Sequence, residues 1–174
     1  MSQQAPAHEW DKTFPKSDHV THEKVTFTTN FGITLAADLY KPRNAEGALK
    51  EQASGLYAQT MAERGFLTIA FDPSFTGESG GAPRYMSSPD INTEDFLSAV
   101  DYLVCREDVD GDRVGIIGIC GWGGIALNAA AADPRIKATL ASTMYDLCRI
   151  SGNGYNDSAD DAATRIASRK LVAA

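Results

Sequence analysis

The chain has 174 residues, of which 43% are hydrophobic and 22% are charged, and its formal net charge is −7. These values are typical of one soluble globular domain. The acidic balance argues against a nucleic-acid partner and against an anionic membrane surface, because both require a basic face.

The N-terminal third predicts an arm, a β-hairpin and a helix. Residues 1–22 are polar and lack a clear period, which is typical of an arm or a short helix. Residues 24–29 and 33–40 predict two strands, joined by a turn whose asparagine and glycine suit positive φ. Residues 50–64 predict a helix, which Gly65 ends as a C-cap.

From residue 66 onward, apolar runs alternate with helical patterns. The run at 66–71 predicts a buried parallel strand, and 72–83 is a long turn rich in glycine, serine and proline. The later elements are a helix starting at 92–95 with Phe96, Val100, Leu103 and Val104 on its apolar face, strands at 114–119 and 136–142, and helices at 123–132 and 159–171. This alternation predicts the α/β class, with a mostly parallel sheet, helices on both faces and an N-terminal antiparallel hairpin.

The uncharged run at 114–132 is also long enough to be tested as a membrane span. It contains five glycines and Asn128, and a β-type first half is followed by an alanine-rich second half. A buried strand, turn and helix fit this pattern better than a spanning helix does.

A strand that runs into a glycine-rich turn is the main functional signal. Residues 113–124 read Arg-Val-Gly-Ile-Ile-Gly-Ile-Cys-Gly-Trp-Gly-Gly. Small residues leave room for a tight turn, and the N-terminus of the following helix favours a thiolate or an oxyanion. The stretch resembles the nucleophile elbow of the dienelactone-hydrolase-like branch of the α/β hydrolases.

Two further stretches carry this resemblance, which covers residues 24–146. Residues 71–81 are similar to the loop after the fourth strand of that fold, and 133–138 are similar to its lead into the sixth strand. The resemblance implies a pocket loop containing Asp72, Thr76 and Gly77. The alternative interpretation of this loop is a turn in which Asp72 binds the loop backbone.

The register of the elbow is open from the sequence alone. Counting forward from the strand places Cys120 at the nucleophile position, with Gly118, Gly121, Trp122 and Gly123 forming the turn and the oxyanion side. Counting back from the last two glycines places Gly121 or Trp122 there, and neither is a nucleophile. A third interpretation treats Cys120 as a buried small apolar residue.

The resemblance also implies groups that this sequence does not place after the elbow. The family's acid and histidine follow the nucleophile, whereas His8, His19 and His22 precede it. We interpret these histidines as exposed surface residues. Asp146 is the first acid after the last predicted strand, and we interpret it as a solvated acid.

A central strand is also expected to be absent. Residues 41–49 have loop composition, where the family carries a strand whose following loop donates one oxyanion N–H. We therefore expect a truncated fold, with an arm at 1–22, a partial hydrolase domain at 23–146 and a polar helical tail at 147–174. Loss of one oxyanion donor typically lowers kcat by ~10²–10³.

The resemblance implies an ester, lactone or thioester hydrolase in which Cys120 attacks a small-molecule substrate without a cofactor or metal. We expect its activity in this chain alone to be slow or absent. The alternatives are a non-catalytic paralogue that binds partners or forms a homo-oligomer through its incomplete sheet, a redox or ligand-binding role for Cys120, and a nucleotide-binding domain, whose glycine spacing does not match.

Cysteine usage indicates the compartment. Cys105, Cys120 and Cys148 are odd in number and irregularly spaced, and they show no zinc-type pairing. This usage favours a reducing cytoplasm over a disulfide framework. Residues 1–10 lack a basic segment followed by an apolar one, so we also expect no secretory signal.

Overall fold

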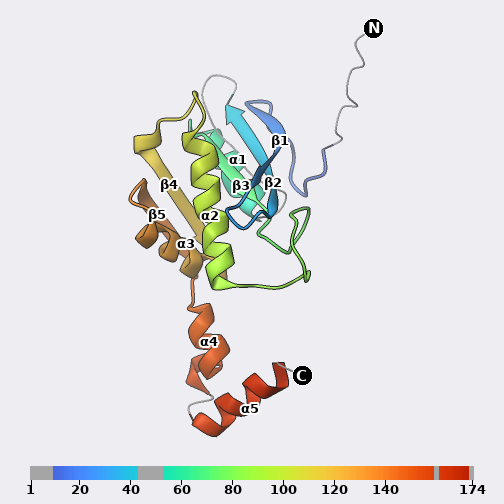
Figure 1. Ribbon diagram of the computed structural model, residues 1–174. Coiled ribbons are helices and arrows are strands. Elements are labelled where there is room, and N and C mark those ends of the chain that lie inside the picture. The colour runs from blue at the N-terminus through green and yellow to red at the C-terminus, as the bar shows by residue number, and fades with distance from the viewer. Residues whose placement is uncertain (1–9, 43–52, 159–160, 173–174) are drawn as a thin grey trace. The chain divides into compact units, whose positions relative to one another are not determined.

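The computed structural model describes residues 10–42, 53–158 and 161–172 (Figure 1). Their contacts divide the chain into two compact units, Met1–Met86 with Tyr102–Val109, and Ser87–Asp101 with Asp110–Ala174. The elements in chain order are β1 (Val20–Thr28), β2 (Thr34–Pro42), α1 (Ala53–Ala62), β3 (Thr68–Phe71), α2 (Pro89–Val104), η1 (Gly111–Arg113), β4 (Val114–Ile119), α3 (Gly121–Ala132), β5 (Ile136–Ser142), α4 (Leu147–Asn153), η2 (Tyr155–Asp157) and α5 (Ala162–Val172).

The first unit contains an antiparallel sheet in the order β1-β2-β3. The hairpin is confirmed: Thr28 pairs with Thr34, and Gly32 has a φ of 75° in the turn between them. β1 begins at Val20, four residues before the predicted strand. Polar residues on this strand hide the alternation, because His22 is partly covered by contact with a buried carboxylate rather than by apolar packing.

A buried ion pair between Lys12 and Asp38 places part of the N-terminal segment in the core. The Asp38 carboxylate is fully buried and lies 2.7 Å from His22 Nε2 and 3.0 Å from Lys12 Nζ. Burial raises the pKa of Asp38, but the hydrogen bonds from His22 and then Lys12 outweigh burial and hold it below its ordinary value.

The interpretation of His22 as a surface residue was therefore wrong, because its side chain is only 14% exposed. His19 is exposed as predicted, and His8 lies outside the described residues.

Aromatic packing completes this core. Phe14, Val20, Leu39, Tyr40 and Ala62 are buried together, and Trp10 packs against them. The Trp10 indole N–H also donates to the Phe14 carbonyl at 2.7 Å. No helix is present at residues 10–19, so one of the two interpretations of the predicted arm is excluded for that part.

The predicted helix at 50–64 is α1 over its described residues, and residues 50–52 lie outside them. Gly65 follows it with a φ of 95°, and its N–H donates to the Ala62 carbonyl at 2.9 Å. The predicted buried parallel strand was wrong in its pairing, because β3 pairs antiparallel with β2. Phe66, at the start of the predicted strand, is 51% exposed.

The second unit contains the parallel pair β4 and β5, whose bounds match the predicted strands. α3 packs against both strands and begins at Gly121, two residues before the predicted helix. The helix can begin there because a single residue, Cys120, makes the turn between β4 and α3. The α/β class is thus confirmed.

Two helices differ more from their predicted bounds. α2 begins at Pro89, three residues before the predicted start, because proline is tolerated in the first turn. Asn92 is buried inside that helix, and its side chain accepts from the Ser88 N–H at 2.9 Å. α4 was not predicted; the Asp146 side chain caps it by accepting from the Arg149 N–H at 2.9 Å. α5 agrees with the predicted tail helix within three residues.

Most of the segment that would hold the central strand, residues 43–49, lies outside the described residues.

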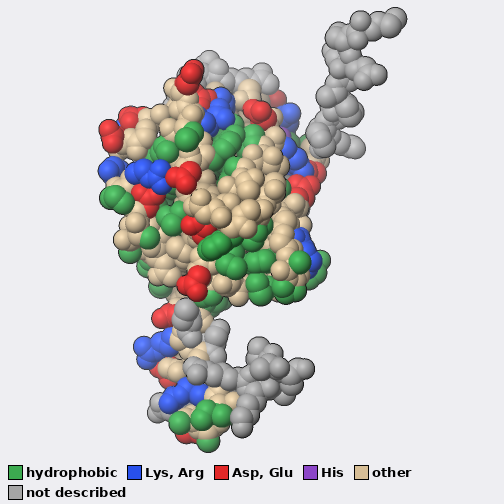
Figure 2. Space-filling model, in the orientation of Figure 1, with side chains coloured by type: hydrophobic (Ala, Val, Ile, Leu, Met, Phe, Trp, Pro, Cys, Tyr) green, Lys and Arg blue, Asp and Glu red, His purple; other side chains and the backbone are tan. Residues whose placement is uncertain are grey.

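Figure 2 shows basic side chains next to acidic ones on the visible face. Among the ion pairs, Arg135 lies 2.6 Å from Asp133 and Arg149 lies 2.6 Å from Asp157. Of the described helices, none has the length and apolar character needed to cross a bilayer.

Candidate functional site

Cys120 forms the turn between β4 and α3. Its φ of 60° and ψ of −135° are strained for a residue with a Cβ. Its N–H donates to the Ser142 carbonyl at 2.9 Å, which ties the turn to the end of β5. The thiol is exposed, so the interpretation of Cys120 as a buried apolar residue was wrong.

The geometry also distinguishes the three registers. Gly121 and Trp122 are the first residues of α3, and neither has a positive φ. The sharp strand-to-helix position is therefore occupied by Cys120. Its role as a nucleophile, and the roles of Gly118, Gly121, Trp122 and Gly123 around it, remain predictions.

The glycines around the turn permit two close approaches. A Cβ on Gly118 would lie 2.5 Å from the Trp122 carbonyl oxygen and 2.6 Å from the Ala126 Cβ. Glycine at this position therefore lets α3 lie directly on β4. A Cβ on Gly123 would lie 2.5 Å from the Met144 Cβ, so this glycine admits the segment after β5.

That segment brings a tyrosine to the thiol. Cys120 Sγ lies 3.7 Å from Tyr145 Oη, in a hydrogen bond that the thiol donates. This hydrogen bond and the charge of Cys120 raise the pKa of Tyr145. Sequence reasoning missed Tyr145, because nothing local distinguishes it from other polar residues after the strand.

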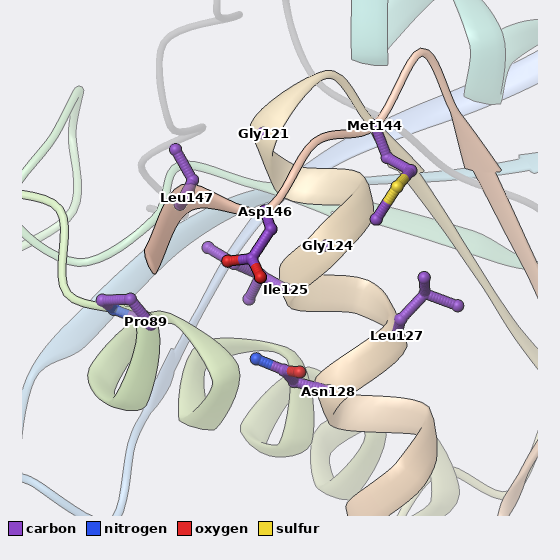
Figure 3. Close-up of a pocket in the computed structure, with 9 residues that line it drawn as sticks. All are labelled: Pro89, Gly121, Gly124, Ile125, Leu127, Asn128, Met144, Asp146 and Leu147. Carbon is purple, nitrogen blue, oxygen red and sulfur yellow. The ribbon is translucent and has the colours of Figure 1, made fainter. Parts of the chain in front are cut away.

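A cavity of about 290 Å³ lies beside the first turns of α3 (Figure 3). Its lining is mostly apolar and consists of Pro89, Gly121, Gly124, Ile125, Leu127, Asn128, Met144, Asp146 and Leu147. Asp146 is exposed as predicted, but it is also the α4 N-cap, a role the sequence analysis did not anticipate.

The predicted pocket loop lies in the first unit and forms a turn with hydrogen bonds of its own. The Asp72 carboxylate accepts from the Glu78 N–H at 2.7 Å, and the Thr76 hydroxyl donates to the Pro73 carbonyl at 2.8 Å. Gly77 has a φ of 52° and passes so close to Asp72 that a Cβ would overlap its carboxylate. These contacts agree with the turn interpretation, and a pocket role for Asp72, Thr76 and Gly77 stays a prediction.

Several known proteins are similar to this chain. The family model described as X-Pro dipeptidyl-peptidase (S15 family) matches residues 3–160. The uncharacterized protein PA2218 of Pseudomonas aeruginosa is 61% identical in an alignment of 163 positions that covers 86% of this chain and 44% of that protein. Thiohydrolase aneE of Aspergillus aculeatus is 28% identical over 134 residues, which cover 72% of this chain and 42% of that protein. The chain spans about half the length of the curated relatives it matches.

Solved structures agree with this relationship. The crystal structure of the Pseudomonas aeruginosa protein PA2218 superposes with a TM-score of 0.89 at 55% identity, covering 99% of this chain and 57% of that one. The α/β hydrolase GrgF from Penicillium superposes with a TM-score of 0.63 at 26% identity, covering 68% and 44%. Membership of the dienelactone-hydrolase-like branch stays a prediction. The family match over residues 3–160 and the solved structures show that the chain belongs to the peptidase S15 family and has the fold of the α/β hydrolases.

Proposed function

We propose that this chain forms an acyl-enzyme in which Cys120 attacks an ester or thioester and retains the acyl group. The observation that carries the proposal is the exposed thiol in a strained turn between a strand and a helix. An activated nucleophile in this fold occupies such a turn, because the strain presents its side chain to the substrate. The thiohydrolase among the relatives supports a thioester as one substrate class.

The first chemical step, attack by the Cys120 thiolate, requires no second side chain to transfer a proton. The Cys120 thiolate attacks the carbonyl carbon, a C–S bond forms, and the bond to the leaving oxygen or sulfur breaks with its electron pair. A p-nitrophenyl ester loses p-nitrophenolate, which needs no proton at neutral pH. Gly121, as the first residue of α3, carries an N–H without an intrahelical acceptor, and this group can bind the developing oxyanion.

Hydrolysis of the acyl-enzyme requires a base, which Cys120 and Gly121 do not supply. Water must lose a proton to attack the acyl-enzyme, and the usual base is a histidine. The described residues of the second unit include no histidine. We therefore expect the acyl group to remain on Cys120 in this chain, while hydrolysis is proposed for the longer proteins to which it is related.

Peptide cleavage is a weaker proposal than ester or thioester cleavage. An amine leaves only after it accepts a proton from a positioned acid, which is the role of histidine in serine hydrolases. A phenolate or thiolate leaves without that proton. The groups around Cys120 thus favour activated acyl donors.

The cavity beside α3 supports a substrate with an apolar acyl group. Ile125, Met144 and Leu147 form apolar walls, and Gly121 connects the cavity to the turn that carries the thiol. Figure 3 shows Asn128 and Asp146 directed toward the same space. We propose that an acyl chain of a few carbons occupies this cavity.

Intact-protein mass after brief exposure to p-nitrophenyl acetate and p-nitrophenyl hexanoate tests this function. We expect one acyl adduct in wild type, none at this site in Cys120→Ala, and an unchanged adduct in Cys105→Ser, whose thiol is also exposed. Peptide mapping separates Cys120 from Cys105 and Cys148. An adduct that persists supports the acyl-enzyme without hydrolysis. If Cys120 acylates no faster than Cys105, the nucleophile assignment fails and a non-catalytic role remains.

A further inference from the structure

We propose that Tyr145 is a catalytic residue of this site, whose hydroxyl contacts the Cys120 sulfur and, once the thiol has lost its proton, donates a hydrogen bond that holds the sulfur for attack. The inference rests on the proposed acyl-enzyme function. It starts from one contact, the 3.7 Å between Cys120 Sγ and Tyr145 Oη. Sulfur forms long hydrogen bonds, and this contact joins the phenol to the reacting atom itself.

The direction of this hydrogen bond depends on the thiol proton. A neutral thiol donates to the phenol oxygen, as in the structure. A thiolate has no proton and can only accept, so the phenol then rotates its O–H toward sulfur. Hydrogen bonds to an ionised acceptor are stronger than neutral ones, so this contact orients the sulfur more firmly once it is a thiolate.

The phenol keeps its proton at neutral pH. The hydrogen bond with Cys120 and the charge on Cys120 both raise the pKa of Tyr145. Tyr145 is therefore a hydrogen-bond donor at neutral pH and not a base. Its role is to stabilise and orient the sulfur, whereas the thiol proton leaves to solvent.

The backbone around Tyr145 is held against α3 on both sides. A Cβ on Gly123 would overlap the Met144 Cβ at 2.5 Å, and a Cβ on Gly124 would lie 3.0 Å from the Tyr145 carbonyl oxygen. On the other side, Leu147 packs on Gly121 at 3.2 Å from the position of a Cβ. These glycines let residues 144–147 cross the start of α3, and this crossing places the phenol beside the thiol.

The segment is also fixed at its two ends. Thr143 has a φ of 49°, which turns the chain after β5, and the Asp146 side chain caps α4. Tyr145 lies between these two fixed points. The glycines at the start of α3 therefore leave room for the turn and also for the segment that brings Tyr145 to the thiol.

The test measures thiol alkylation in a Cys105→Ser/Cys148→Ser background, in which Cys120 is the remaining cysteine. The variants are Tyr145→Phe, which removes only the hydroxyl, and Tyr145→Ala, which removes the ring. Tyr155→Phe is the matched control, because Tyr155 is an exposed tyrosine of the same unit. The readout is the second-order rate constant with iodoacetamide at pH 7, with circular dichroism to compare the folded state of each variant.

We expect Tyr145→Phe and Tyr145→Ala to lower the rate severalfold, and Tyr155→Phe to leave it unchanged, because the first two remove the hydroxyl that contacts the sulfur and the third leaves that contact in place. If Tyr145→Phe keeps the wild-type rate, the hydroxyl has no role and the proposal fails, whatever the effect of Tyr145→Ala.

Acylation by p-nitrophenyl acetate in the same variants separates this proposal from the proposed function. A loss of alkylation rate without any acyl adduct in the parent would mean that the contact exists and the acyl-enzyme does not. An acyl adduct whose formation rate is the same in Tyr145→Phe would mean that Cys120 reacts without Tyr145.

Discussion

Replacing Cys120 with glycine should stabilise the second unit relative to replacing it with alanine. Both variants lack the thiol, so they differ only in the Cβ that occupies a φ of 60° and a ψ of −135°. A residue with a Cβ in such a region costs ~1–3 kcal/mol, and glycine does not pay this cost. Glycine loses roughly 0.4–1 kcal/mol of this gain through the greater freedom of the unfolded chain.

The expected difference is therefore about 1 kcal/mol in favour of Cys120→Gly. Native-state hydrogen exchange of peptides from β4 and α3 measures it, because it reports the opening of this region without requiring the whole chain to unfold in one step. Cys105 is the control, measured in peptides of the first unit that contain it, since it is also exposed but does not have a positive φ. There glycine should be less stable than alanine by roughly 0.4–1 kcal/mol.

Glycine at position 120 that proves no more stable than alanine would refute the backbone strain assigned to Cys120. Such a result would mean that the turn carries no strain and that Cys120 is not held at a special backbone position. If glycine is more stable than alanine at position 120 but less stable than alanine at position 105, the backbone strain lies at Cys120 and not at Cys105.

Three further outcomes follow from contacts described above. Gly118→Ala should destabilise the fold by about 3 kcal/mol in urea unfolding, whereas Gly115→Ala on the same strand should cost less than ~1 kcal/mol, because its Cβ would meet no atom closer than 3.4 Å. Asp38→Asn should cost about 3 kcal/mol at pH 7, since Lys12 and His22 lose a buried charged partner. The lowered pKa of Asp38 contributes stability that is complete above about pH 4 and lost as the pH falls below it, so Asp38→Asn should lose less stability between pH 5 and pH 2 than wild type. Equal pH slopes for the two proteins would contradict this account.

The strands around the site could be predicted because local patterns specify them. β4 and β5 are short apolar runs bounded by an acidic turn and by an Asp-Pro break, and their ends match the predicted ones. The direction of β3 could not be predicted, because an apolar run is the same whether its neighbour is parallel or antiparallel. The start of β1 was missed because His22 is covered by contact with Asp38, sixteen residues away.

The candidate site was predicted only where its residues are neighbours in sequence. Cys120 and the glycines around it form one continuous motif, so their position in the turn followed from the strand and helix on either side. Tyr145 reaches the thiol across 25 residues through a crossing that exists only in the folded chain. The capping role of Asp146 was missed for a different reason, because the short helix that it starts has no clear apolar period.

The crossing of α3 by the segment after β5 also restricts the order in which this sequence can evolve. A Cβ at position 123 would lie 2.5 Å from the Cβ of Met144, so side chains at both positions are incompatible. Alanine at position 123 becomes accessible after residue 144 changes to glycine, whereas the reverse order passes through an intermediate with overlapping atoms. The two positions are therefore epistatic, and one of the two mutational paths between these sequences is closed.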